Sequence, residues 1–253
     1  MNAHDGLVRP EDFSNCGLPL HELNQPRVGE VHVWYLDLGS LGLSLQNVLG
    51  GGERSIGRQP LTLEQLKFAR RFYLKLLLGA YLGIPGKRVK INRSKRGKPS
   101  LDRSTHQSDL NFSMAKSEDH VLIGFSHTAI LGVDLEVAGR RAHDPMGVAR
   151  RYFTALESKG IEFTSPDRLD EAFLRAWACK ESVVKASGHG IANQFCRFSV
   201  ETNLDKPPAI LEFVNEDPKR WSLAMLQPDE DFVGAVAMHH RQMNVCAFTL
   251  APS

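Results

Sequence analysis

The sequence has few cysteines and no long hydrophobic run. Its four cysteines, at positions 16, 179, 196 and 246, lie far apart and form no Cys-x-x-Cys pair. That spacing argues against a zinc site or a disulfide framework and favours a reducing compartment. The most apolar stretch, residues 76–84, is far shorter than the roughly 20 residues of a membrane-spanning helix. Residues 1–15 also have no apolar core typical of a signal peptide, so we expect a cytoplasmic protein outside the membrane.

The charges nearly balance, with 31 Lys and Arg against 29 Asp and Glu, for a net charge of +2. This value alone neither favours nor excludes a polyanionic partner. Hydrophobic residues make up 42% and charged residues 24% of the 253 residues, which excludes a disordered or fibrous chain and fits one large or two small globular domains. Helical and strand patterns mix without regular alternation, which favours an α+β fold.

The pattern predicts helices and strands along most of the chain. We expect strands at 31–38, 111–125 and 130–137, and mostly strands after residue 195. Helices are expected at 61–82, with Thr62 as N-cap, at 145–158, and from Ser165-Pro166 to about 186. Residues 1–29 have the composition of a surface arm. The Gly50-Gly-Gly52 triplet favours a flexible loop over a phosphate cradle, because no P-loop Lys-Ser/Thr follows it.

Two carboxylates share one face of the strand Gly132-Val-Asp-Leu-Glu136. Because strand side chains alternate, Asp134 and Glu136 point to the same side. Neighbouring carboxylates repel each other unless a cation lies between them, and a hard cation such as Mg²⁺ suits oxygen ligands. Taken alone, the motif favours a half-exposed strand with two solvated acids.

A second motif lies on the last predicted helix. Trp177, Glu181 and Lys185 follow one another at one-turn intervals along a single helix face. Beside the Asp134 and Glu136 face, Glu181 would be a third oxygen ligand and Lys185 would neutralise a substrate phosphate. Taken alone, the spacing of Glu181 and Lys185 favours a surface ion pair.

A third feature is a basic run with no acid in it, made of Lys87, Arg88, Lys90, Arg93, Lys95, Arg96 and Lys98. A solvated loop and a nucleic-acid patch are alternatives, but no aromatic residues interleave the charges, as single-strand binding usually requires. A compact polyphosphate fits the run at least as well, so we expect no nucleic-acid partner.

In chain order, these motifs resemble the 4′-phosphopantetheinyl transferases of the larger, single-chain type, the group that includes the surfactin-synthetase activator. The last motif, residues 177–190, is similar to the family signature Trp-x-x-Lys-Glu-x-x-x-Lys-Ala-x-Gly-x-Gly. The resemblance covers most of residues 31–200 and includes the segments 71–83, 97–99, 110–117, 132–136 and 152–157.

The resemblance implies two similar subdomains in a pseudo-twofold arrangement, with coenzyme A in the cleft between them. We expect an arm at 1–29, an N-terminal subdomain at 30–128 and a C-terminal subdomain with the metal site at 129–253. The implied reaction moves the phosphopantetheine arm of coenzyme A onto a serine of an apo acyl, peptidyl or polyketide carrier protein and releases 3′,5′-ADP. We expect the chain to act as a monomer.

The resemblance also implies the roles of individual residues. Asp134, Glu136 and Glu181 would hold Mg²⁺, or Mn²⁺, on the pyrophosphate, and Glu181 and Lys185 would be catalytic. The proton of the carrier serine would go to Glu181 or to a water on the metal. Coenzyme A would be bound by Arg93, Arg96, Lys98, Pro99, Lys116, Ser117 and Lys185. Arg71 and Lys75 are either further phosphate ligands or structural residues.

The chain departs from the family pattern next to the expected nucleotide site. Ala115 and Lys116 stand where the family has Ser and His. Lysine can bind the same 3′-phosphate, since it is charged at neutral pH and has three donors. Thr62 replaces an expected phosphate-binding arginine, a role for which Arg58 is a candidate. These departures leave an alternative function open, a non-catalytic scaffold that binds coenzyme A or a carrier protein.

Overall fold

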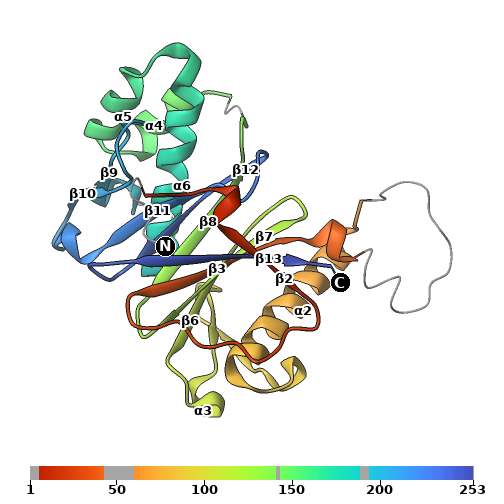
Figure 1. The fold of residues 1–253 in the computed structure, drawn as a ribbon. Helices are drawn as coiled ribbons and strands as arrows, with labels where there is room; N and C mark the ends of the chain where they lie inside the picture. The colour runs from red at the N-terminus through yellow and green to blue at the C-terminus, as the bar shows by residue number, and fades with distance from the viewer. Residues whose placement is uncertain (1–5, 43–59, 141–142, 189–193, 253) are drawn as a thin grey trace.

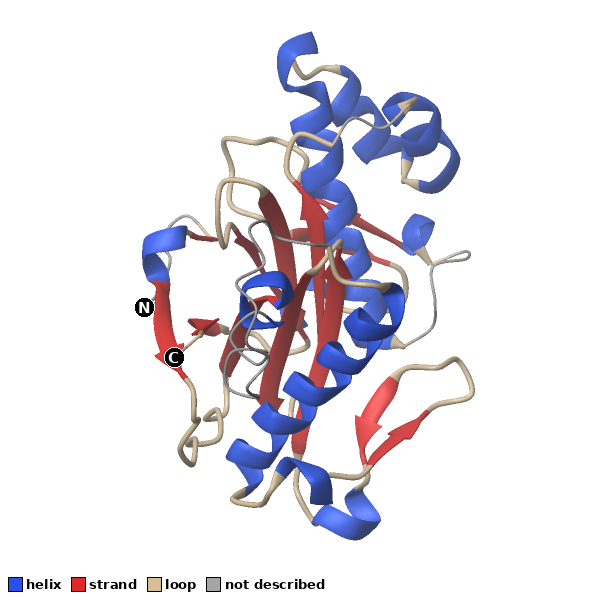
Figure 2. Cartoon of the chain, turned by 90° about the vertical axis from the view of Figure 1, so that its right-hand side faces the viewer, coloured by secondary structure: helices blue, strands red, loops and turns tan. Residues whose placement is uncertain are grey.

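The computed structural model describes residues 6–42, 60–140, 143–188 and 194–252 (Figure 1). Helix α2, a five-stranded sheet, a four-stranded sheet and helix α6 are stacked in that order. Three apolar clusters fill the spaces between these layers. One lies under α2, one between the two sheets and one under α6. Figure 2 shows α2 crossing one face of the central sheets.

The five-stranded sheet has the order β2-β13-β3-β7-β6. Its strands span Phe13–Gly17, Asn244–Ala251, Glu30–Asp37, His120–His127 and Leu110–Ser117. β13 runs parallel to both of its neighbours, whereas β3, β7 and β6 are antiparallel. The end of the chain therefore completes a sheet made mainly by its first half.

The four-stranded sheet has the order β1-β11-β12-β8. Its strands span Leu7–Val8, Ser222–Leu226, Phe232–Met238 and Leu131–Val137. The same order of elements occurs twice along the chain: a strand, a long helix and an antiparallel hairpin. These elements are β3, α2 and β6-β7 in the first half, and β8, α6 and β11-β12 in the second. In the sheets, β7 pairs with β3, and in the same way β12 pairs with β8. This repeated topology confirms the predicted α+β fold with two similar subdomains, although no short sequence repeat reveals it.

The two long helices begin and end at residues that the sequence marks. α2 (Leu63–Leu82) starts with a capping box, in which Thr62 Oγ1 accepts from Gln65 N at 3.2 Å and Gln65 Oε1 accepts from Thr62 N at 2.8 Å. It ends at Gly83, whose φ of 63° is left-handed. α6 (Leu169–Ser187) ends in the same way at Gly188, with a φ of 71°. Glycine adopts these angles without the steric cost that other residues pay.

The single helix predicted at 145–158 is wrong. The segment forms two helices, α4 (Pro145–Tyr152) and α5 (Ala155–Glu162). The break follows from Thr154, which takes an extended conformation and starts α5 with a capping box to Glu157. The next helix is also preceded by a separate 3₁₀ turn, Pro166–Arg168, before α6 begins.

The remaining elements are short. A β4-β5 hairpin (Ile91–Arg93 and Pro99–Leu101) and helix α3 (Arg103–His106) precede β6. A β9-β10 pair (Phe198–Val200 and Ile210–Phe213) follows α6. Further 3₁₀ turns span Pro10–Asp12, Gly86–Arg88, Phe195–Arg197 and Pro218–Arg220.

Part of the predicted N-terminal arm belongs to the two sheets, because β1 is an edge strand of the four-stranded sheet and β2 is an edge strand of the five-stranded sheet. The proposed division at residues 29 and 128 stays a prediction. Residues 50–52 and Arg58 lie outside the described residues. Among the helices that the structure describes, none is long and apolar enough to cross a membrane.

Candidate functional site

Strand β8 presents the two predicted carboxylates to helix α6. A Cβ atom at Gly132 would lie 1.9 Å from the carbonyl oxygen of Ser182 on α6, so glycine is what lets the helix approach the strand this closely. Side chains two residues apart on a strand share a face. Asp134 and Glu136 therefore face α6 as well, while the residues between them point into the apolar cluster between the sheets.

Asp134 is buried and forms an ion pair with Lys185. Lys185 Nζ lies 2.6 Å from Asp134 Oδ1, and the Asp134 side chain is only 5% exposed. Its other carboxylate oxygen, Oδ2, is buried and has no hydrogen-bond partner among the described residues. An unpartnered buried oxygen of this kind is costly. Asp134 is therefore not a solvated acid, and Lys185 is not engaged in a surface pair with Glu181.

Glu136 contacts two side chains beside it. Arg140 Nη1 lies 3.3 Å from Glu136 Oε2. Burial and then the charge of Asp134 raise the pKa of Glu136, whereas the indole of Trp177 lowers the pKa of the same carboxylate in part. Trp177 also packs in an aromatic cluster with Phe153, Phe173 and Phe195. Trp177 thus packs against the core of this half of the chain and also lies beside a predicted metal ligand.

Glu181 completes a group of three carboxylates. It is 7% exposed, and its pKa is raised to about 7 by burial and then by the nearby charges of Asp134 and Glu136, which Lys185 only partly offsets. Crowded carboxylates with a buried, unpartnered oxygen are the kind of donor set that a hard divalent cation such as Mg²⁺ prefers. The residues present therefore fit the predicted metal.

The three carboxylates must move closer together before they can share one ion. Their oxygens do not all lie within 4.8 Å of one another. Among the described residues, the group of potential ligands that meets this distance is a different one, made of Asp37, Asp119 and His120. Lys185 also holds one oxygen of Asp134. Binding of a cation at the predicted site thus requires side-chain movement, and Asp134 can offer Oδ2 to it while Lys185 holds Oδ1.

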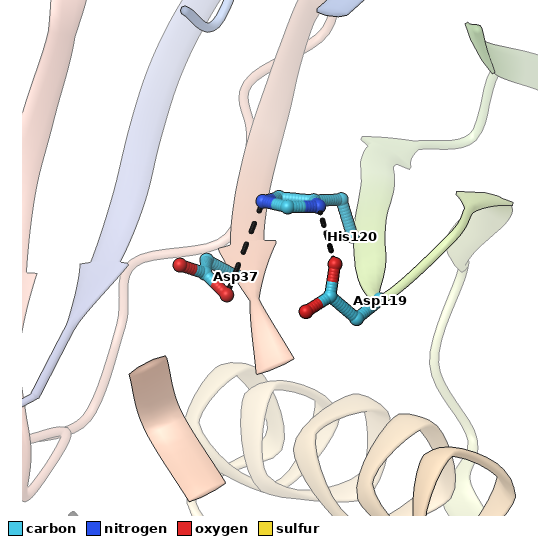
Figure 3. Close-up of side chains that lie close together, drawn as sticks. All are labelled: Asp37, Asp119 and His120. Carbon is cyan, nitrogen blue, oxygen red and sulfur yellow. Dashed lines mark ion pairs between the residues drawn. The ribbon is translucent and has the colours of Figure 1, made fainter. Parts of the chain in front are cut away.

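The group of Asp37, Asp119 and His120 lies where β3 ends and β7 begins (Figure 3). Asp119 Oδ1 is 2.9 Å from His120 Nδ1, and Asp37 Oδ1 is 3.9 Å from Nε2, so the carboxylates flank the two ring nitrogens. Ser40 donates to Asp37 from its backbone N at 3.1 Å and from its hydroxyl. Because these groups already contact one another, we assign no metal to them. No sequence motif predicts this cluster, whose members come from segments about 80 residues apart.

Lys98 is the residue of the basic run that reaches α6. Its Nζ donates to the carbonyl oxygens of Lys185 at 2.5 Å and Ala186 at 2.9 Å. Pro99 follows it and helps to line a cavity of about 130 Å³. Arg93, on the opposite strand of the hairpin, is exposed and donates to the carbonyl of Gly97 at 3.2 Å. Arg96, at the hairpin tip, is also exposed.

Other predicted ligands do not contact the carboxylates. Lys116 is exposed near the end of β6 and points away from the face of Ala115, which is buried between the sheets. Ser117 shares the face of Ala115 by strand alternation. Arg71 and Lys75 lie on α2, which covers the other end of the stack of layers. The structure thus groups Asp134, Glu136, Glu181, Lys185 and Lys98, and leaves these four residues apart from them.

A cavity of about 700 Å³ reaches Arg140, the ion-pair partner of Glu136, although none of the three carboxylates lines it. Its lining includes Arg140, which pairs with Glu136, and Val233, which is the cross-strand partner of Glu136. Leu174 on α6 and the segment 204–208 complete part of its wall. Sequence reasoning missed both the cavity and Arg140. The spacing of Arg140, four residues after Glu136, is the one signal that points to it.

Comparisons with known proteins agree with this geometry. Residues 130–237, which contain all three carboxylates and Lys185, match the family model of the 4′-phosphopantetheinyl transferase superfamily. The chain is 29% identical over 223 residues to the 4′-phosphopantetheinyl transferase HetI of Nostoc sp., covering 83% of this chain and 87% of that protein. It is 22% identical over 221 residues to a 4′-phosphopantetheinyl transferase of Bacillus subtilis, covering 78% and 95%. The chain is thus similar to 4′-phosphopantetheinyl transferases over most of its length, and residues 130–237 match the model of that superfamily.

Other proteins are matched over a smaller share of one of the two chains. The human L-aminoadipate-semialdehyde dehydrogenase-phosphopantetheinyl transferase is 28% identical over 188 residues, 67% of this chain and 60% of that protein. Among solved structures, a holo-(acyl-carrier-protein) synthase from Bacillus anthracis in complex with CoA is 21% identical, with a TM-score of 0.35, and covers 44% of this chain and 95% of that chain.

Proposed function

We propose that the protein transfers the 4′-phosphopantetheine group of coenzyme A to a serine of an apo carrier protein and releases 3′,5′-ADP. The matching family model and the curated relatives support this reaction. The observation that carries the proposal is the convergence of Asp134, Glu136 and Glu181 around a buried, unpartnered carboxylate oxygen, with Lys185 beside it. A protein that only binds its ligand has little need of such a group.

The reaction is a substitution at phosphorus. The serine oxygen forms a bond to the phosphorus that carries pantetheine, and the bond from this phosphorus to the bridging oxygen breaks, so that 3′,5′-ADP leaves with that oxygen. The serine proton would go to Glu181 or to a water on the metal. Lys185, beside Asp134, is placed to offset the charge that develops on the leaving phosphate.

Asp134, Glu136 and Glu181 would hold the divalent cation, Mg²⁺ or Mn²⁺. When bound, such an ion withdraws charge from the pyrophosphate and stabilises the leaving group. Arg140 and Trp177 contact Glu136 and would orient it toward the ion. The nucleotide phosphates would be met by the cations of the β4-β5 hairpin, Arg93 and Arg96, and by Lys116 at the 3′-phosphate.

The surroundings of the site suggest how the other substrates bind. The cavity of about 700 Å³ that reaches Arg140 has room for the pantetheine arm. The partner would be an acyl, peptidyl or polyketide carrier protein.

The three carboxylates and Lys185 come from one chain, which supports action as a monomer. No disulfide joins the four cysteines, all of which lie in the described part of the chain, and this supports our placement of the protein in the cytoplasm.

A non-catalytic scaffold is the alternative function, motivated by Ala115 and Lys116. The two proposals differ in whether 3′,5′-ADP is released. We would incubate the protein with coenzyme A, Mg²⁺ and several apo carrier proteins, and quantify 3′,5′-ADP by chromatography. A transferase releases it only with an apo carrier, and not with a carrier whose acceptor serine is replaced by alanine. Binding of coenzyme A without any release across the carriers would favour the scaffold.

A further inference from the structure

The carboxyl end of α6 is held by a lysine from the other half of the chain. α6 ends at Ser187, so the carbonyl oxygens of Lys185 and Ala186 lie in the last turn, where intrahelical donors run out. Lys98 Nζ donates to both of them, at 2.5 and 2.9 Å. An ammonium group at this position also interacts favourably with the negative end of the helix dipole.

The β4-β5 hairpin holds Lys98 firmly in this place. Ser94 Oγ accepts from Lys98 N at 3.1 Å, and Lys98 O accepts from Ser94 N at 2.9 Å. The methylene chain of Lys98 lies beside Gly188, where an added Cβ would be 3.7 Å from Lys98 Cδ. Burial lowers the pKa of Lys98, and none of the ion pairs among the described residues includes it. Its charge is therefore satisfied by the helix end.

We propose that Lys98 is a positioning residue, which fixes the last turn of α6 and through it the Lys185 side chain, rather than a direct ligand of a coenzyme A phosphate. Lys98 binds the backbone of Lys185, and the side chain of Lys185 in turn reaches Asp134 at 2.6 Å. The β4-β5 hairpin of the first half of the chain is thereby joined to the catalytic helix of the second. The kinetic part of this inference rests on the proposed function, whereas the structural part does not.

Hydrogen exchange of the substrate-free protein tests the structural part. In Lys98→Met, which keeps the aliphatic chain and loses the donors, we expect amide exchange at residues 184–188 to become at least about tenfold faster, as for a segment with a lower local stability. Lys95→Met removes a charge from the exposed tip of the same hairpin and is the matched control, with exchange unchanged. Equal exchange in Lys98→Met and the parent protein would overturn the proposal, whether or not the protein is a transferase.

Steady-state kinetics distinguish positioning from phosphate binding. A misplaced Lys185 lowers kcat with little change in the KM for coenzyme A. Loss of a phosphate contact that acts equally in the ground state and the transition state instead raises KM and leaves kcat unchanged. We expect the first pattern for Lys98→Met, and the second would contradict the proposal.

The parent protein provides a test that needs no variant. Addition of 3′,5′-ADP should leave the exchange of residues 184–188 unchanged or slower. If the nucleotide instead made this turn exchange faster, Lys98 would have left the helix end for a phosphate, and the proposal would be wrong.

Discussion

Lys180 and Glu157 form an ion pair in which neither side chain has exposed surface. Lys180 Nζ lies 2.7 and 2.8 Å from the two carboxylate oxygens and donates to the carbonyl of Phe198 at 2.7 Å. Glu157 also accepts from Val200 N at 2.8 Å and from the backbone and hydroxyl of Thr154. Lys180 directly precedes one of the three site carboxylates on α6, so this satisfied pair fixes the helix next to the site.

Glu157→Gln should destabilise the fold strongly. The substitution leaves the Lys180 ammonium buried without its counter-charge, and breaking a buried pair in this way costs about 3–5 kcal/mol. We expect a loss of this size in the free energy of unfolding measured by urea denaturation.

The matched control is Glu162→Gln on the same helix. Glu162 pairs with Arg150 at 2.8 Å, but both side chains are more than half exposed, and exposed pairs contribute little to stability. Equal losses in the two variants would show that burial does not decide the effect, contrary to this account.

The stability of the metal-free protein should depend on pH through Glu181. Its pKa in the folded state, about 7, lies above the ordinary 4.5, so the folded state binds this proton more tightly than the unfolded state. Stability from this group is therefore lost as the pH rises from about 4.5 to about 7. Mg²⁺ replaces the proton, so we expect it to raise the midpoint of thermal unfolding more at about pH 8 than at about pH 5.5.

Glu181→Gln serves as the control for this pH dependence. The amide removes one of three crowded charges, so the metal-free variant should be more stable than the parent at about pH 8 and should gain little from Mg²⁺. A Mg²⁺ effect in the parent that is the same at both pH values, or that survives in the variant, would argue against a cation held by Glu181.

Trp177→Phe should weaken metal binding while leaving the fold intact. Phenylalanine keeps most of the packing with Phe195 but removes the indole N–H, which favours the charged form of Glu136. Partners that orient metal ligands typically contribute 10- to 100-fold to affinity, and we expect a loss of about tenfold in Mn²⁺ affinity by calorimetry. Trp221→Phe also loses an indole N–H, which donates to Glu216 at 3.0 Å, and should leave Mn²⁺ affinity unchanged.

Lys116→Ala tests the predicted contact with the 3′-phosphate of coenzyme A. We expect the parent to prefer coenzyme A to 3′-dephospho-coenzyme A in kcat/KM, and the variant to lose most of that preference, about tenfold or more for a charged contact. If the variant discriminates between the two as well as the parent does, Lys116 has no role at that phosphate.

The sequence predicts those parts of the site that lie within one element. Alternation along β8 and the helical spacing of α6 place Asp134, Glu136 and Glu181 on facing surfaces, because each pattern follows from the geometry of a single strand or helix. The capping residue Thr62 marks the start of α2 for the same reason. A resemblance to a known family then gives the fold that brings these elements together.

The parts that the sequence did not predict depend on contacts between distant segments. Glu157 ends a segment that resembles the family, but its partner Lys180 lies 23 residues away and has the sequence pattern of an ordinary helical lysine. Lys98 reads as one cation of a basic run until the structure places it on the end of α6. No local pattern encodes such pairs, because they form only when the hairpin, α5 and α6 pack together.

The account is tested most directly by intact-mass spectrometry of an apo acyl carrier protein after incubation with this protein, coenzyme A and Mg²⁺. We predict that the carrier gains one phosphopantetheine group, and that the gain disappears with EDTA and with Asp134→Ala, a variant that should still fold. No gain with any carrier tested, or an undiminished gain with Asp134→Ala, would contradict a transferase whose chemistry depends on this carboxylate site.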